Sequence, residues 1–149
     1  MDLTKGVPRS GHDTIGGIVM LARAIDKMRA HLAGTLGEYI AHKGFSVDVF
    51  DLFGTDAATF EEIVRTHDTD EDVLASLMAI KQPTAEEIAS FNHEMTIYPS
   101  NDPAGVERMH GRMAAAGFGA RTDIVTSFDS WDLEEGRDVP IGGRLASGH

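Results

Sequence analysis

The 149-residue chain contains no cysteine and carries a formal net charge of −11, with 42% hydrophobic and 25% charged residues. This composition is typical of a single globular domain, and the lack of cysteine excludes disulfides and thiolate metal ligands. The acidic balance argues against nucleic acid as a partner, because such binding uses Lys and Arg to neutralise phosphates. No apolar run approaches the ~20 residues of a membrane span, and the N-terminus lacks a secretory signal, so we expect a cytoplasmic protein with no membrane partner.

The first part of the chain is expected to form an extended segment and then a long helix. Residues 1–12 are expected to be an extended lead-in, because proline and glycine punctuate them. Asp13 or Thr14 is expected to cap the helix, which would run to about Leu32 before two glycines end it.

The rest of the chain carries further helix signals. Residues 47–53 are apolar enough for a short buried helix, with a strand as the alternative. Beyond them, residues that favour the N-cap position precede apolar residues at helical spacing. These predicted caps are Asp56, Thr69, Thr84 (with Glu87 in a capping box), Asp102 (with Pro103 at the first helical position) and Asp123. Residues 136–149 are Gly-rich and are expected to form a mobile tail.

These elements predict the fold class. No segment alternates apolar and polar residues over more than four positions, so no strand is indicated. Short connections between short amphipathic segments are typical of helical domains. We therefore expect an all-α single domain, residues 1–149, of six or seven short helices with no substantial sheet.

Charged residues in the first predicted helix mark the best candidate site. At 100° per residue the apolar residues of this helix gather into one stripe, yet Arg29 falls inside the stripe and Asp26 lies at its edge. An Asp–Arg pair three residues apart can meet on a helix surface, and a buried guanidinium needs such a partner. We therefore expect a largely buried ion pair between Asp26 and Arg29.

Two interpretations of this pair stay open. In the first, the pair is structural and fixes the helix against the rest of the domain. In the second, Arg29 or Arg23 grips a carboxylate or phosphate, Arg9 adds positive charge, and Asp26 orients the guanidinium or acts as a base. Trp131, the single tryptophan, would then supply a lid, unless it is a core residue.

The seven histidines provide no short-range metal motif. No two of them are four residues apart, and the one carboxylate–histidine pair at helical spacing, Glu38 with His42, lies in a segment of ambiguous structure. We therefore expect no metal site, no other cofactor, and full stability without a transition metal.

Three stretches of the chain carry a family resemblance. They are Met1-Asp-Leu-Thr-Lys-Gly-x-Pro-Arg-Ser10, Gly16-Gly-x-x-x-Leu-x-Arg-x-Ile-Asp-Lys-x-Arg-Ala-x-Leu-Ala-Gly-Thr-Leu-Gly-Glu-Tyr39 and Phe53-Gly-x-Asp-Ala57. Together they resemble the bacterial family catalogued as domain of unknown function 5069. The resemblance implies a small, mainly helical, cytosolic protein and assigns no catalytic residue. The chain departs from the family pattern at Gly11 and Ala22, where the family has proline.

Two classes of function follow from these observations. The first is a pocket walled by the first helix that binds a small organic anion, with acid–base chemistry by Asp26 and Arg29 allowed but not required. The second is a non-enzymatic protein-interaction or assembly module whose charges are structural. A pocket with converging polar groups would favour the first class, whereas an exposed apolar patch or extensive self-contact would favour the second. Assembly into a homodimer is left open.

Overall fold

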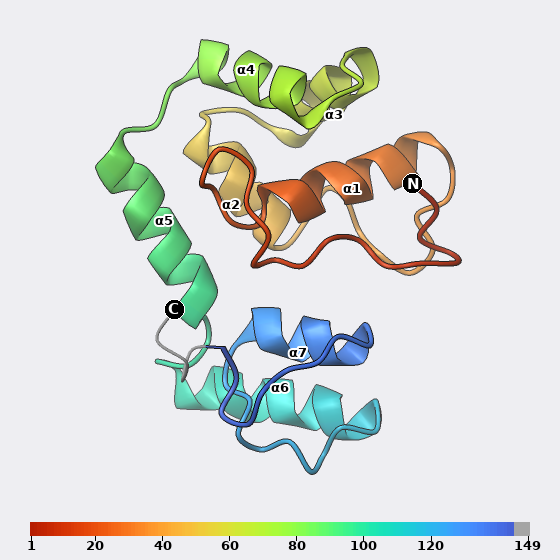
Figure 1. The fold of residues 1–149 in the computed structure, drawn as a ribbon, viewed down its shortest axis with the longest axis vertical. Coiled ribbons are helices and arrows are strands. Elements are labelled where there is room, and N and C mark those ends of the chain that lie inside the picture. The colour runs from red at the N-terminus through yellow and green to blue at the C-terminus, as the bar shows by residue number, and fades with distance from the viewer. Residues whose placement is uncertain (145–149) are drawn as a thin grey trace. The chain divides into compact units, whose positions relative to one another are not determined.

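The computed structural model describes residues 1–144 and contains seven helices there (Figure 1). The helices are α1 (Leu21–Leu32), α2 (Phe45–Leu52), α3 (Ala57–Thr66), α4 (Asp70–Ile80), α5 (Ala85–Ile97), α6 (Pro103–Ala115) and α7 (Ser127–Glu134). Helix accounts for 52% of the residues described, and these residues form no strand beyond one isolated bridge between Ile15 and Ile18. The predicted all-α class is confirmed. None of the helices in this range combines the length and the apolar character needed to cross a membrane.

The chain divides into two compact units, residues 1–92 and residues 93–149. We call them unit 1 and unit 2, and the boundary falls inside α5. The single domain expected from the sequence stays a prediction, and each unit is considered below by itself.

The first helix begins later than predicted. The predicted start at Asp13 or Thr14 is wrong, because α1 begins at Leu21. A tight turn precedes it, in which Gly16 and Gly17 both adopt positive φ angles of 60° and 76°. Two successive left-handed residues match a type I′ turn, which reverses the chain and cannot belong to a helix.

Most of the other predicted helix starts are confirmed. The side chains of Asp56 and Thr69 accept hydrogen bonds from backbone N–H groups in the first turns of α3 and α4. Thr84 and Glu87 form the predicted capping box, since each side chain accepts from the other residue's backbone N–H at 3.1 Å. The predicted cap at Asp123 is wrong. α7 is capped by Thr126, which lies directly before its first residue.

Unit 1 is built around α1. This helix contacts α2 and α3, and α3 also contacts α2 and α4. Most of the apolar face of α1 is buried, as are the large side chains that the neighbouring helices supply. These core residues include Leu21, Ile25, Met28, Phe50, Phe60, Val73 and Leu77. The lead-in contacts the segment that follows α1, because the backbone N–H of Leu3 donates to the carbonyl of Thr35 at 2.8 Å.

Unit 2 packs α6 against α7 over a small core of Met109, Met113, Ile124 and Val139. Asp123 holds the following segment in place, since it accepts from the guanidinium of Arg121 and from the backbone N–H of Gly142. These contacts lower the pKa of Asp123 to about 2, and the hydrogen bond from Arg121 is the largest cause. Part of the predicted mobile tail therefore contacts the unit, whereas residues 145–149 lie outside the described residues.

The packing of the lead-in generates a prediction about two glycines. Gly34 and Gly37 both have positive φ angles, so alanine at either position costs about 1–2 kcal/mol of backbone strain. A Cβ at Gly37 would also lie 2.9 Å from the carbonyl oxygen of Leu3, whereas a Cβ at Gly34 would meet nothing within 4 Å. We expect Gly37→Ala to lower the free energy of unfolding more than Gly34→Ala does, as measured by urea denaturation. Equal losses would contradict this account of how the lead-in packs.

Candidate functional site

Arg9, in the lead-in, joins two acidic residues from different helices. Its Nη2 lies 3.0 Å from Oδ1 of Asp26 on α1, and its Nη1 lies 2.7 Å from Oδ2 of Asp70 at the start of α4. A guanidinium has a planar fork of donors that can serve two carboxylates at once. Arg9 therefore connects three segments of unit 1 that are far apart in the sequence.

Both carboxylate oxygens of Asp26 accept hydrogen bonds from Arg9. Its Oδ2 accepts from the backbone N–H of Arg9 at 2.9 Å and from Nε of Arg9 at 3.0 Å, and its Oδ1 accepts from Nη2. The side chain is only 4% exposed. A buried carboxylate requires this kind of compensation, because an unpaired charge in the interior is costly.

The ion pair between Arg9 and Asp70 also shifts the pKa of both groups. The hydrogen bond from Arg9 is the largest cause that lowers the pKa of Asp70, and the nearby charge of Arg29 acts in the same direction. The pKa of Arg9 is raised, mainly by its hydrogen bond to Asp70. Both groups are therefore charged at neutral pH.

The expected pairing of Asp26 with Arg29 is wrong. Nη1 of Arg29 lies 3.4 Å from Oδ1 of Asp70, and its Nη2 donates to the backbone carbonyl of Asp68 at 3.1 Å. Arg29 is also not largely buried, because 29% of its side chain is exposed. The spacing in the helix permits a contact with Asp26, but Arg9 already occupies that carboxylate.

Arg23 and Trp131 lie in other surroundings. Arg23 is buried on α1, where its Nη1 donates to the carbonyl of Arg9 at 3.2 Å and its guanidinium lies 5.7 Å from the centre of the Tyr39 ring. Trp131 belongs to unit 2, where its ring packs against Phe128 on α7 with the centroids 5.8 Å apart. Whether Trp131 acts as a lid stays a prediction.

A pocket of about 530 Å³ lies beside Arg29. It is formed by the last turns of α1 and α3 together with the segment that follows α3. Its lining residues are Arg29, Leu32, Ala33, Val64, Arg65, His67 and Asp68. The contribution of α3 could not be predicted from the sequence, because a helical wheel orders residues around one helix and does not show which second helix faces it.

The imidazole of His67 in this pocket is fixed by its neighbours. Its Nδ1 lies 2.8 Å from the carbonyl oxygen of Ile63, which can only accept, so Nδ1 carries a proton. Nε2 lies 3.0 Å from the hydroxyl of Ser76. The ring is thus held at the pocket wall by both of its nitrogens.

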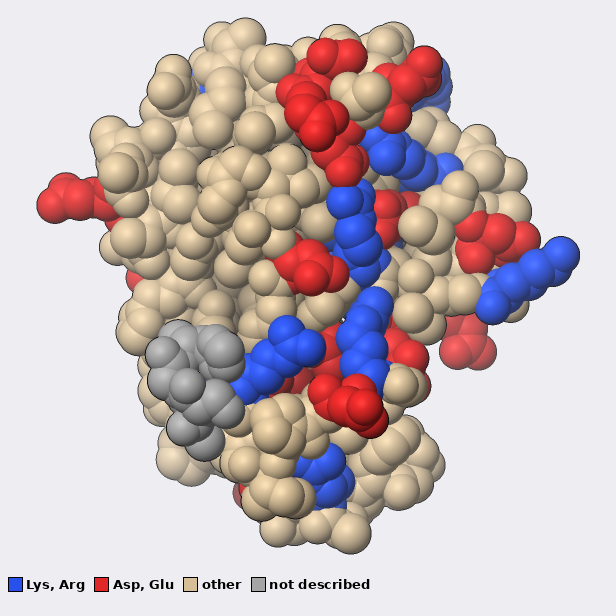
Figure 2. Space-filling view, viewed as in Figure 1, with Lys and Arg blue, Asp and Glu red and all other residues tan. Residues whose placement is uncertain are grey.

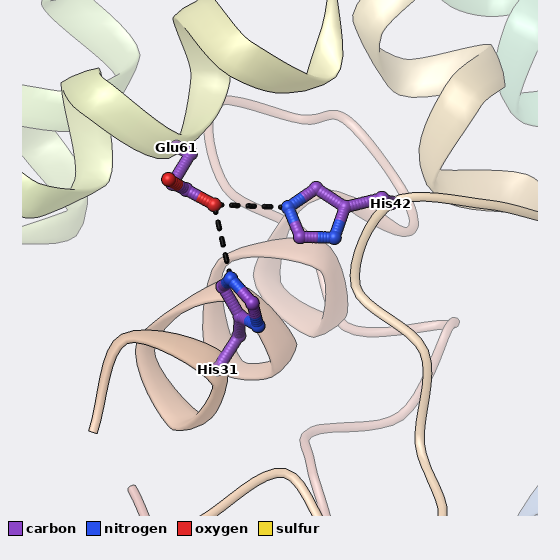
Figure 3. Close-up of side chains that lie close together, drawn as sticks. All are labelled: His31, His42 and Glu61. Carbon is purple, nitrogen blue, oxygen red and sulfur yellow. Dashed lines mark hydrogen bonds and ion pairs between the residues drawn. The ribbon is translucent and has the colours of Figure 1, made fainter. Parts of the chain in front are cut away.

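A second group of polar side chains lies in the same unit. His31 at the end of α1, His42 before α2 and Glu61 on α3 point toward one another (Figure 3). Oε1 of Glu61 lies 3.0 Å from Nε2 of each histidine. The hydrogen bond to His42 is the largest cause that lowers the pKa of Glu61. Sequence spacing could not reveal this group, because its members come from three separate segments.

The surface charges do not form a separate basic patch in the view of Figure 2, where Lys and Arg side chains lie next to Asp and Glu. This agrees with the pairing of Arg9, Arg29 and Arg65 with carboxylates. A ligand that approaches these arginines would therefore meet partly neutralised charges.

The sequence profile of the family described as "Domain of unknown function (DUF5069)" matches residues 5–137. This match covers most of the chain, so the chain belongs to that family, as its motifs indicate. No curated protein sequence matches it.

The geometry of Arg9 generates a prediction about stability. In Arg9→Met, the buried carboxylate of Asp26 would keep, among its partners in residues 1–144, only the backbone N–H of residue 9, so we expect a loss on the order of 3–5 kcal/mol in the free energy of unfolding. The matched control is Lys81→Met, which removes an exposed ion pair with Glu87 in the same unit. This control should cost no more than about 1 kcal/mol.

Urea denaturation of both variants checks the expectation. Adding Asp26→Leu to Arg9→Met should recover most of the loss, since no buried charge is then left alone. Losses of similar size in Arg9→Met and Lys81→Met would mean that the Arg9 ion pairs are not structural.

Proposed function

We propose that the protein binds a small organic anion, a carboxylate or a phosphate, in the pocket at the ends of α1 and α3. The observation that supports this proposal most is the lining of the pocket, in which two guanidinium groups and an imidazole adjoin three apolar side chains and the acidic Asp68. A few polar groups converging over an apolar surface are typical of small-molecule sites. The volume of about 530 Å³ also falls within the usual range of ligand pockets.

Arg29 is the proposed anchor of the anion. Its two hydrogen bonds, to Asp70 and to the carbonyl of Asp68, use two of the five N–H donors of a guanidinium. The remaining donors can form bidentate hydrogen bonds to a carboxylate or phosphate, the geometry that favours arginine at such sites. Arg65 and His67 would add contacts from the side of α3.

The charge balance of the pocket limits which anions it would hold. Both arginines lie in the last turns of their helices, where cations offset the negative end of the helix dipole. Arg65 is also paired with Glu61 and Glu62. This partial neutralisation favours a ligand of low charge with a short apolar part against Leu32, Ala33 and Val64, rather than a polyanion.

This proposal gives a structural role, instead of the predicted role in catalysis or ligand binding, to Asp26, Arg9 and Arg23. Because Asp26 is buried and bonded at both oxygens, we assign it to holding α1 against the lead-in rather than to proton transfer. Arg9 and Arg23 would position α1 and would not touch the ligand. The proposal thus includes binding and no reaction, while the expected cytoplasmic location and homodimer stay predictions.

The alternative function, a protein-interaction module, has less support. Large exposed apolar side chains would form its contact surface. In residues 1–144 these side chains come from separate segments of the chain. They are Met1, Val7, Ile40, Val47, Ile80, Tyr98 and Ile141.

Thermal unfolding in the presence of inorganic phosphate and of butyrate, a monocarboxylate with a short apolar chain, tests the proposal. A ligand that binds only the folded state raises the midpoint as its concentration increases. We expect at least one of the two anions to do so for the wild type and neither to do so for Arg29→Met. Without ligand, Arg29→Met should lose no more than about 1 kcal/mol, because its ion pair is partly exposed.

Lys5→Met is the matched control, since it removes the same charge from an exposed position outside the pocket. This variant should respond to the anions as the wild type does. A response that survives in Arg29→Met would show that the anion does not bind at Arg29. A response lost equally in both variants would come from overall charge and not from the pocket.

A further inference from the structure

The group formed by His31, His42 and Glu61 has a donor set that proteins use to bind transition metals. Two imidazole nitrogens and one carboxylate oxygen are the protein ligands of several zinc sites and of non-haem iron sites. Here the three ligand atoms all lie within 4.8 Å of one another. The two rings meet edge to face with their centroids 4.5 Å apart, and both direct Nε2 toward the same oxygen (Figure 3).

We propose that Nε2 of His31, Nε2 of His42 and Oε1 of Glu61 bind one divalent transition-metal ion of the zinc type. Ligands about 2.0–2.2 Å from a tetrahedral metal lie ~3.3 Å from each other. The two nitrogen–oxygen distances of 3.0 Å are already within a few tenths of an ångström of that value. Small side-chain movements would therefore open a space of the right size for the ion. This proposal departs from the sequence-based expectation of no metal site.

The protonation of the ligands is compatible with metal binding. Each histidine would have to carry its proton on Nδ1 and leave Nε2 free. Within residues 1–144 neither Nδ1 makes a hydrogen bond, so this change of tautomer breaks no other contact in that part of the chain. Glu61 also keeps its ion pair with Arg65 through Oε2, which favours the charged carboxylate that a metal ligand needs.

Arg65 orients the carboxylate for this role. Its Nη2 lies 3.1 Å from Oε2 of Glu61, which leaves Oε1 directed at the two histidines. Neighbouring groups that hold a ligand in its binding orientation raise the affinity of metal sites. Arg65 would thus position the metal ligand from one side and line the anion pocket from the other.

The arrangement would form an open site rather than a closed structural one. Three protein ligands leave at least one position of a tetrahedral ion for water or another small molecule. The side chains of His31, His42 and Glu61 are 39%, 35% and 24% exposed, so solvent can reach them. The competing account is that each Nε2 carries a proton and donates it to Glu61, which explains the distances without any metal.

Calorimetric titration of the chelator-treated protein with Zn²⁺ distinguishes the two accounts. We expect one equivalent of zinc to bind the wild type and to raise its thermal midpoint. His31→Gln, His42→Gln and Glu61→Gln should each weaken binding by at least ~10-fold, since even changes to groups behind the ligands cost that much. His93→Gln, at an exposed position on α5, is the matched control and should bind zinc as the wild type does.

Circular dichroism without metal checks that each variant folds, and the partial exposure of all three ligands makes folding the expected result. Failure of the wild type to bind one equivalent would overturn the proposal. So would unchanged binding by all three ligand variants, which would place zinc elsewhere. The anion test uses no metal and the zinc titration uses no anion, so each proposal can fail without the other.

Discussion

The guanidinium of Arg9 is the group on which the charge arrangement of unit 1 depends. It contacts the buried carboxylate of Asp26 on α1 and the carboxylate of Asp70 on α4, and it does so from a lead-in without secondary structure. Removing one partner of a buried ion pair costs more than the pair itself contributes, because the other charge is left alone in the interior. The position of the lead-in is thus coupled to the packing of two helices.

This coupling determines which charged residues are available for a ligand. Asp26 and Arg9 form an ion pair with each other, and Arg23 holds the lead-in by donating a hydrogen bond to the carbonyl of Arg9. Arg29 shares Asp70 with Arg9 at the longer distance of 3.4 Å and lines the pocket. The proposed anion site is therefore built around the arginine of α1 that is held least tightly. His31, His42 and Glu61 form a second group of polar side chains, for which we propose metal binding.

The sequence predicted local structure better than contacts between segments. Caps at Asp56, Thr69 and Thr84 were predictable, because a cap depends on residues only three positions apart. The start of α1 was missed, since apolar periodicity continues through Gly16 and Gly17 although both have positive φ. The partner of Asp26 was missed for a different reason. Arg9 is seventeen residues away from Asp26 in the sequence, and helical periodicity does not show which part of α1 the lead-in contacts. The anion pocket and the histidine–glutamate group also require knowledge of which helices face each other.

The most direct test concerns Asp70, because it connects the structural ion pairs to the pocket. Asp70→Asn removes one carboxylate partner of Arg9. It also removes the one carboxylate partner that Arg29 has within the described residues. The matched control, Asp72→Asn, removes an equal charge from the same helical turn. The measurement is anion affinity and urea stability of both variants, with phosphate or butyrate as the ligand. The account predicts that Asp70→Asn is less stable than Asp72→Asn yet binds the anion several-fold more tightly, because Arg29 is less neutralised. Anion affinity that falls in Asp70→Asn, or that changes equally in the two variants, would contradict it.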